Sequence, residues 1–164
     1  MGDIRLLQEI VDWIKGEYRP THFISIQMPF EAKTTDIEAF TKGLHYLLRR
    51  AQRELLGRYW VSKHYRFIIA FENGRSGNWH AHMLFSCPDR TIYEIRNAFD
   101  KAGTDYRKQR RTRDIPNIDI RPITNNLNRV VKYCTKEAVL GQHGRFSSER
   151  IDMSENMFNH RSGR

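Results

Sequence analysis

The stretch from Arg66 to Phe85 constrains the fold of this chain more than any other. Two apolar runs flank the segment Asn73-Gly-Arg-Ser-Gly-Asn78, whose residue types favour a turn between two strands. The pattern therefore predicts a β-hairpin, and a hairpin in a chain of this kind belongs to an antiparallel sheet.

The alternation of side chains assigns each hairpin residue to one face of the sheet. The apolar sets that we expect to face the core are Phe67, Ile69 and Phe71 on the first strand and Ala81, Met83 and Phe85 on the second. Ala70, His80, His82 and Leu84 then face the other way. Glu72 falls on the same face as the two histidines.

Two imidazoles one residue apart on a strand, together with a nearby carboxylate, can hold one divalent cation. His-x-His on a strand is also common as two partly exposed histidines that bind no metal. The pattern of His80, His82 and Glu72 leaves both interpretations open.

Charge narrows the class of partner. The chain has 164 residues, with 28 Lys and Arg against 19 Asp and Glu, which gives a net charge of +9. Such an excess favours a polyanion, with nucleic acid ahead of a membrane surface, although a generally basic protein is the simpler alternative.

The only cysteines, Cys87 and Cys134, form no Cys-x-x-Cys pair, so we expect a reducing compartment and no zinc ribbon. Neither an apolar run of about 20 residues nor a signal-peptide pattern occurs, which favours a soluble intracellular protein.

Hydrophobic periodicity, together with residues that typically begin or end helices and strands, predicts the other elements. Thr35 with Glu38, and Thr91 with Glu94, have the spacing of capping boxes, and Gly57 and Gly103 are expected to end the two helices that follow them. Residues 59–65 are expected to lead into the first hairpin strand, with a separate fifth strand as an alternative. The remaining predictions are helices at 3–15 and 126–138 and strands at 21–28 and 117–123.

This order predicts an α+β fold, with a central antiparallel sheet of four to five strands packed by flanking helices on a face. We divide the chain into an N-terminal amphipathic helix (1–20), a central domain (21–140) and a polar tail (141–164). The tail is either a short helix or disordered.

Two groups of basic residues stand out. Arg49, Arg50, Arg53 and Arg58 lie on or beyond the outer face of the second helix, where a solvated surface explains them as well as a DNA contact does. The stretch 101–113 interleaves cations with Tyr106, so we expect it to track a phosphate backbone while the aromatic ring stacks on an unpaired base. Its cations include Arg107, Lys108, Arg110, Arg111 and Arg113.

In the helix at 126–138, Tyr133 lies at the edge of the predicted buried stripe, and Lys136 lies one turn further on. With His80-Ala-His82 upstream, the motif Tyr133-Cys-Thr-Lys136 resembles those of the HUH endonucleases, in particular the single-tyrosine initiators of rolling-circle replication. The strand Phe23–Pro29 resembles the first of the three family motifs. The resemblance runs from about Thr21 to Glu137, although Ala81 is small for its motif position.

The resemblance implies the RRM-like fold and the chemistry of that family. Tyr133 would be the nucleophile, Lys136 would assist it, and His80, His82 and Glu72 would hold Mn²⁺ or Mg²⁺, although zinc or nickel can bind such a site more tightly. Glu72 is carried over on the weakest ground, because the third ligand varies in the family. The reaction would nick and rejoin single-stranded DNA through a 5′-phosphotyrosine.

The implied partners are single-stranded DNA, as an origin or a hairpin, and a host replication helicase. The chain carries no Gly-x-x-x-x-Gly-Lys-[Ser/Thr] loop of its own. The setting would be the cytoplasm of a prokaryotic host or the nucleus for a eukaryotic virus. A transposase or relaxase of the same superfamily is an alternative. So is a non-catalytic module that binds single-stranded nucleic acid, which aromatics on an exposed sheet face would favour.

Overall fold

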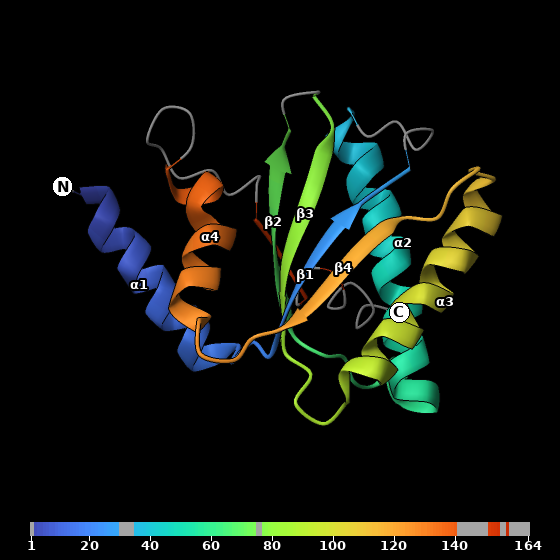
Figure 1. Cartoon of the computed structure of the whole chain (residues 1–164), viewed down its shortest axis with the longest axis horizontal. Coiled ribbons are helices and arrows are strands. Elements are labelled where there is room, and N and C mark those ends of the chain that lie inside the picture. Colours follow the sequence, from blue (N-terminus) through green and yellow to red (C-terminus); the bar gives the residue numbers. More distant parts are fainter. Residues whose placement is uncertain (1, 30–34, 75–76, 141–150, 155–156, 158–164) are drawn as a thin grey trace.

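The computed structural model describes residues 2–29, 35–74, 77–140, 151–154 and 157. Five strands form one antiparallel sheet in the order β4-β1-β3-β2-β5 (Figure 1). The strands are β1 (His22–Gln27), β2 (Phe67–Asn73), β3 (Trp79–Phe85), β4 (Asn117–Pro122) and β5 (Ile151–Met153). The helices are α1 (Gly2–Glu17), α2 (Ile37–Leu56), the 3₁₀ helix η2 (Gly57–Val61), α3 (Ile92–Arg110) and α4 (Leu127–Leu140). The α+β prediction is confirmed.

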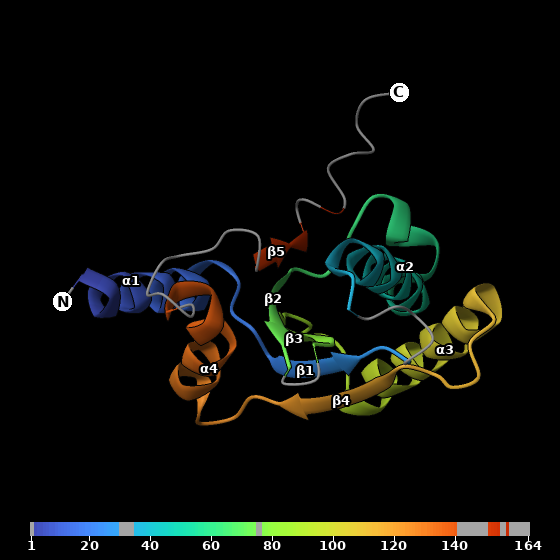
Figure 2. The ribbon, with the colours of Figure 1, turned by 90° about the horizontal axis from the view of Figure 1, so that it is seen from above.

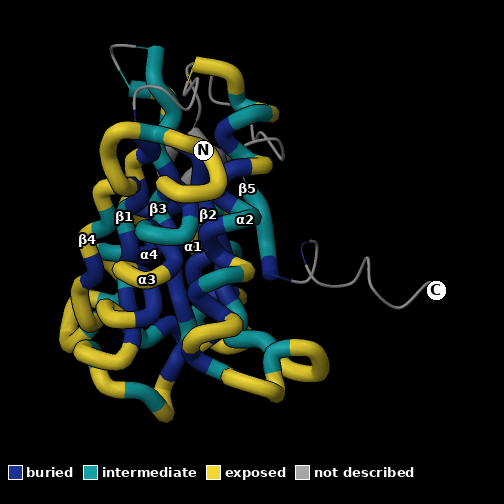
Figure 3. The backbone as a smooth tube through the Cα atoms, turned by 90° about the vertical axis from the view of Figure 1, so that its right-hand side faces the viewer, coloured by how far each residue is buried: buried dark blue, intermediate teal, exposed yellow. Residues whose placement is uncertain are grey.

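The sheet is covered on both faces, whereas the sequence predicted helices on one. Figure 2 shows α2 and α3 on one side of the sheet and α1 and α4 on the other. The predicted inward residues of the hairpin do form the core under α2 and α3, where Phe67, Ile69, Ala81 and Phe85 are at most 1% exposed. The second core, under α1 and α4, is smaller. Its buried members are Val11, Ile14, Tyr18, Ile68, Ala70, Leu84, Val131 and Cys134. Figure 3 shows the buried residues concentrated along the middle strands of the sheet, whereas the edge strand β4 is more exposed.

Helix boundaries correct two predictions. The side chain of Asp36, not Thr35, caps α2 by accepting hydrogen bonds from the backbone N–H groups of Glu38 and Ala39. The helix α3 does not end at Gly103 but continues to Arg110. Gly103 is buried inside the helix, and a Cβ on it would lie at an ordinary van der Waals distance of 3.6 Å from Pro116 Cδ. The left-handed residue Arg111 ends the helix instead.

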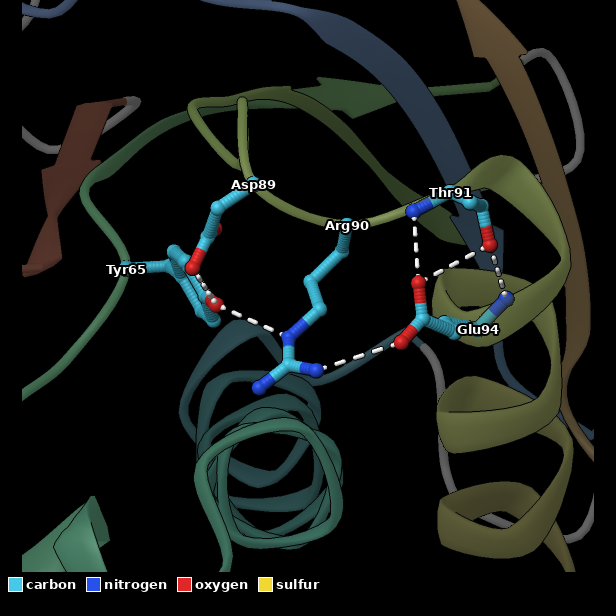
Figure 4. A network of polar contacts seen from close by, with 5 residues as sticks. All are labelled: Tyr65, Asp89, Arg90, Thr91 and Glu94. Carbon is cyan, nitrogen blue, oxygen red and sulfur yellow. Dashed lines mark hydrogen bonds and ion pairs between the residues drawn. The ribbon is translucent and has the colours of Figure 1, made fainter.

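The capping box at Thr91 and Glu94 is confirmed, and it belongs to a larger polar network at the start of α3 (Figure 4). The Thr91 backbone N–H donates to Glu94 Oε2 at 2.8 Å, and Arg90 donates to both Glu94 and the Tyr65 hydroxyl. The Tyr65 hydroxyl donates in turn to Asp89 at 3.0 Å. These contacts fix the connection between β3 and α3 against the segment that precedes β2.

Two further predictions concern segments next to β2. Residues 59–65 form no strand, because Gly57–Val61 turns as a 3₁₀ helix and β2 begins only at Phe67. The fifth strand is Ile151–Met153, from the region that we expected to be helical or disordered. It pairs with Ile68–Ala70 of β2 and is held by its neighbours: His45 Nε2 lies 2.5 Å from Asp152 Oδ2, and the Phe67 N–H donates to Ser154 Oγ. The rest of the tail lies outside the described residues, apart from Met157.

Candidate active site

The register of the sheet brings the predicted ligand residues together. His80 is paired with Glu72 on β2 and with Gln27 on β1, on the face that α1 and α4 cover. His82 Nε2 lies 2.7 Å from Glu72 Oε2, although Glu72 is paired with the other histidine. The side chain of His82 is 14% exposed and that of Glu72 is 37% exposed, so the group lies at the rim of the second core.

Ser25 and Phe23 hold the His82 ring, and Cys134 holds the His82 backbone. Ser25, its partner on β1, places its Oγ 3.1 Å from Nδ1, which leaves Nε2 directed at Glu72. Phe23 stacks on the ring with 5.7 Å between centroids and 12° between planes. The Cys134 thiol donates to the His82 carbonyl oxygen at 3.3 Å, and burial raises the pKa of this thiol to about 12. A thiol of that pKa is a neutral donor near neutral pH.

Tyr133 lies over this face because its neighbours on α4 are buried. Val131 and Cys134 pack into the second core, so residue 133 falls at the edge of the stripe, as predicted, with its side chain 53% exposed. Its ring meets His82 edge to face with 5.4 Å between centroids, and it meets Phe23 in the same way at 6.1 Å. A residue far along the sequence is thereby brought beside the histidine pair.

Space beside the histidines opens toward β4. A cavity of about 90 Å³ is lined by Ser25, Ile26, Gln27, His80, His82, Asn117 and Asp119. Gly74, in the hairpin loop, lies close to His80. A Cβ on Gly74 would lie only 3.0 Å from His80 Nε2. A larger residue at position 74 would therefore displace the imidazole.

Two imidazoles, one carboxylate and a hydroxyl that orients one imidazole are donors that fit a divalent cation. Within the described part of the chain, however, no three His, Cys, Asp or Glu side chains converge as a ready-made metal site. His82 and Glu72 instead bond each other directly, so an ion held by both would have to separate them.

The other predicted residues lie apart from this group or are not described. Lys136 is in α4, one turn after Tyr133, but the side chains of residues 136–140 lie outside the described structure. Arg107, Lys108, Arg110, Arg111 and Arg113 are exposed at the end of α3 and in the connection to β4. Tyr106 is 2% exposed and packs against Tyr46 in the core, so the prediction that it stacks on a base is wrong.

Three residues that the sequence analysis did not assign to the site contact His82: Phe23, Ser25 and Cys134. The sequence does contain a pattern that could have identified two of them, Phe23 and Ser25. Alternation along the strand at 21–28 places Phe23, Ser25 and Gln27 on one face, and antiparallel pairing with the hairpin brings that face to the histidines. The register between the strands was the missing information.

An antiparallel sheet that presents two histidines and a carboxylate beneath a helix-borne tyrosine has the arrangement expected of the HUH class. The chain belongs to the replication-associated protein ORF2/G2P family, whose model matches residues 17–138. This is a family of rolling-circle replication initiators, so the predicted resemblance is confirmed and an interaction with DNA follows. No curated protein and no solved structure matches the chain. None of the described helices is long and apolar enough to cross a membrane.

Proposed function

We propose that this chain is a metal-dependent, site-specific endonuclease that nicks and rejoins single-stranded DNA to initiate rolling-circle replication of a virus, plasmid or mobile element. The observation that carries the proposal is the position of the Tyr133 ring, 5.4 Å from that of His82 on a face that also holds His80 and Glu72. The family match supports the role in replication.

In the proposed reaction, Tyr133 Oη attacks a DNA phosphorus and forms a 5′-phosphotyrosine, in which the phosphate joins the tyrosine to the 5′ end of the downstream DNA fragment. The bond from phosphorus to the 3′ oxygen breaks, and that oxygen leaves as a 3′-OH after taking up a proton. Because the phosphotyrosine is itself a phosphodiester, a 3′-OH can attack it and restore a DNA strand. Nicking and rejoining are the forward and reverse directions of one step.

His80, His82 and Glu72 would hold the cation, with Mn²⁺ or Mg²⁺ as the expected ion. Such an ion would polarise the phosphodiester and offset the negative charge that develops on it. Ser25 and Phe23 would keep the His82 ring in place whether or not DNA is bound, because both contact the ring directly.

Tyr133 must lose its proton, and the ordinary pKa of a tyrosine is about 10. Lys136 follows it by one helical turn, which is the spacing at which side chains on a helix are neighbours. We propose that the Lys136 ammonium group stabilises the phenolate or binds the phosphate. The exposed cations Arg107, Lys108, Arg110, Arg111 and Arg113 would hold the phosphate backbone of flanking DNA.

The test uses a degenerate single-stranded DNA pool with Mn²⁺ and assays for an SDS-resistant protein–DNA adduct. We expect the adduct with the wild-type protein and none with Tyr133→Phe, while DNA binding stays nearly unchanged. Tyr93→Phe is the matched control, because Tyr93 is a 77% exposed tyrosine on the opposite layer, in α3. Sequencing the trapped DNA then gives the nick site.

An adduct that persists in Tyr133→Phe would exclude Tyr133 as the nucleophile. If neither protein forms an adduct although metal and DNA both bind, the non-catalytic binding module becomes the better interpretation. The ligand set has a separate test: His82→Ala should weaken Mn²⁺ binding in calorimetry by at least about tenfold. Unchanged affinity would contradict the proposed ligands.

A further inference from the structure

A second surface combines an exposed tyrosine and a half-buried tryptophan with cations, away from the histidines. It comprises Arg53, Arg58, Tyr59, Trp60, Val61 and Lys63, and we call it the η2 surface. The 3₁₀ helix η2 joins the end of α2 to the start of β2, whereas the histidine pair lies near the hairpin at the other end of that strand (Figure 1). The two sites are therefore at opposite ends of the sheet.

Two large side chains of the η2 surface are exposed to solvent and are not packed into the core. Tyr59 is 51% exposed and Val61 is 70% exposed. The segment is anchored by other residues: the Gln52 amide donates to the Tyr65 carbonyl oxygen at 2.8 Å, and the Tyr65 N–H donates to Gln52 Oε1 at 2.9 Å. An anchored backbone that presents large side chains to solvent is suited to binding.

The cations lie close to these rings. Arg58 places its guanidinium carbon 5.0 Å from the Tyr59 ring centroid, and Lys63 places Nζ 5.6 Å from it. Arg53 lies 6.0 Å from the ring of Trp60. Cation–π attraction thus gathers positive charge around the exposed ring of Tyr59 and the half-buried ring of Trp60.

Carboxylates do not neutralise this charge within the described residues. Arg50, one turn before Arg53 on α2, is paired with Asp105, and Lys101 is paired with Glu54. For Arg53, Arg58 and Lys63, the described structure contains no such ion pair. A solvated helix face explains exposed cations, but it does not explain why Arg53, Arg58 and Lys63 are grouped around the rings of Tyr59 and Trp60.

We infer that the η2 surface binds single-stranded DNA at a distance from the cleaved phosphodiester. Phosphates would meet Arg53, Arg58 and Lys63, and an unpaired base would stack on Tyr59. This is the combination that the sequence analysis expected at residues 101–113, where burial of Tyr106 removes the aromatic partner. The choice of DNA as the ligand rests on the proposed function, but the binding itself requires no cleavage.

The test measures binding of a labelled oligothymidylate by fluorescence anisotropy in EDTA, with Tyr133→Phe protein so that no adduct can form. We expect Tyr59→Ala to weaken binding of an oligonucleotide of about 30 residues roughly tenfold, the usual effect of losing one stacked base. Tyr59→Phe should restore binding, because it keeps the ring. Tyr93→Ala removes a tyrosine of α3 that is even more exposed, 77% against 51% for Tyr59, and should have no effect.

Charge and stacking can be separated by salt. Arg58→Ala with Lys63→Ala removes two phosphate contacts, so the slope of log affinity against log salt should become shallower by about 1.4. Tyr59→Ala should leave that slope unchanged. Arg5→Ala controls for net charge, because Arg5 is an exposed cation on α1.

Photocrosslinking of 5-bromodeoxyuridine-containing DNA then locates the contact, and we expect adducts on residues 58–63. Unchanged affinity in Tyr59→Ala, with crosslinks only elsewhere, would overturn the inference. So would equal binding of a blunt duplex of the same length, since a duplex offers no unpaired base. Because these assays need neither metal nor Tyr133, their failure would not affect the proposed nicking activity, and failure to nick would not affect them.

Discussion

The two faces of the sheet differ in how far their apolar surface extends. Under α2 and α3, the core runs the length of the strands, from Phe85 at one end to Phe71 and Met28 near the other. Under α1 and α4, the apolar surface ends at Ala70 and Leu84, and the rows toward the hairpin are polar. Alternation along the same strands thus supplies stability on one face and the candidate site on the other.

Because the opposite face of the same strands is tightly packed, the residues of the candidate site are held at rigid positions. Ala81 and Met83 are completely buried on the core face, and they flank His82 along the chain. The histidines cannot move far without disturbing that core, because β3 is the central strand of the sheet. Substitutions on the two faces should therefore separate folding from metal binding.

The largest effect is expected on the core face. Leu44 is fully buried in α2, so Leu44→Ala should lower the free energy of unfolding by about 2–5 kcal/mol through lost burial and the cavity left behind. Urea unfolding measures this change. Mn²⁺ affinity of the variant that remains folded should match that of the wild type, and a parallel loss of affinity would show that the two faces are not separable.

For Ser25 we expect the opposite: a substitution should weaken metal binding and leave the stability of the fold nearly unchanged. Ser25→Ala removes the hydroxyl that lies 3.1 Å from His82 Nδ1, so Mn²⁺ affinity should fall about 10- to 100-fold with little change in urea unfolding. Calorimetry measures the affinity. Ser25→Thr keeps the hydroxyl and should restore binding, which a general disturbance of β1 would not allow.

The smallest effect is expected in the polar network at the start of α3. Thr91→Ala removes the side-chain half of the capping box and should cost about 1 kcal/mol in unfolding, with no effect on metal binding. A metal-binding defect in this variant would show that the network also supports the site.

The pH dependence of this network follows from Glu94. The Thr91 N–H, then the Thr91 hydroxyl and Arg90, hold the pKa of Glu94 below its usual value. A lowered pKa in the folded state stabilises the protein above the unfolded pKa of about 4, and this contribution is lost as the pH falls through the folded value. The advantage of wild type over Glu94→Gln in thermal unfolding should therefore shrink on acidification below about pH 4.

Local patterns predicted most of the fold. Alternation assigned Glu72, His80 and His82 to one face, and helical periodicity placed Tyr133 beside the buried stripe of α4. What the sequence could not supply was tertiary: the burial of Tyr106 in the core, which accompanies the continuation of α3 past Gly103, and the contacts of His45 and Phe67 that hold β5. A three-residue strand has too little pattern of its own to be recognised.

The site was predictable in its residue types but not in its contacts. Pairing of Ser25 with His82 depends on the register of two strands that are far apart in sequence, which periodicity does not fix. The prediction that Tyr106 in the basic stretch 101–113 stacks on a base was wrong for a related reason. Tyr106 lies on the buried side of α3, directly against Gly43. Composition alone did not reveal which side of the helix the aromatic residue occupies.

The position of β5 also has a consequence for the order of folding. It covers Ile68–Ala70 on the outer edge of β2, a strand that is apolar on both faces, and such an edge is prone to pair with other chains. During synthesis, β2 and β3 emerge long before residues 151–153, at about 5–20 residues per second. For several seconds the nascent sheet therefore presents an open apolar edge, and its protection from aggregation depends on β5, which is synthesised only after β4 and α4.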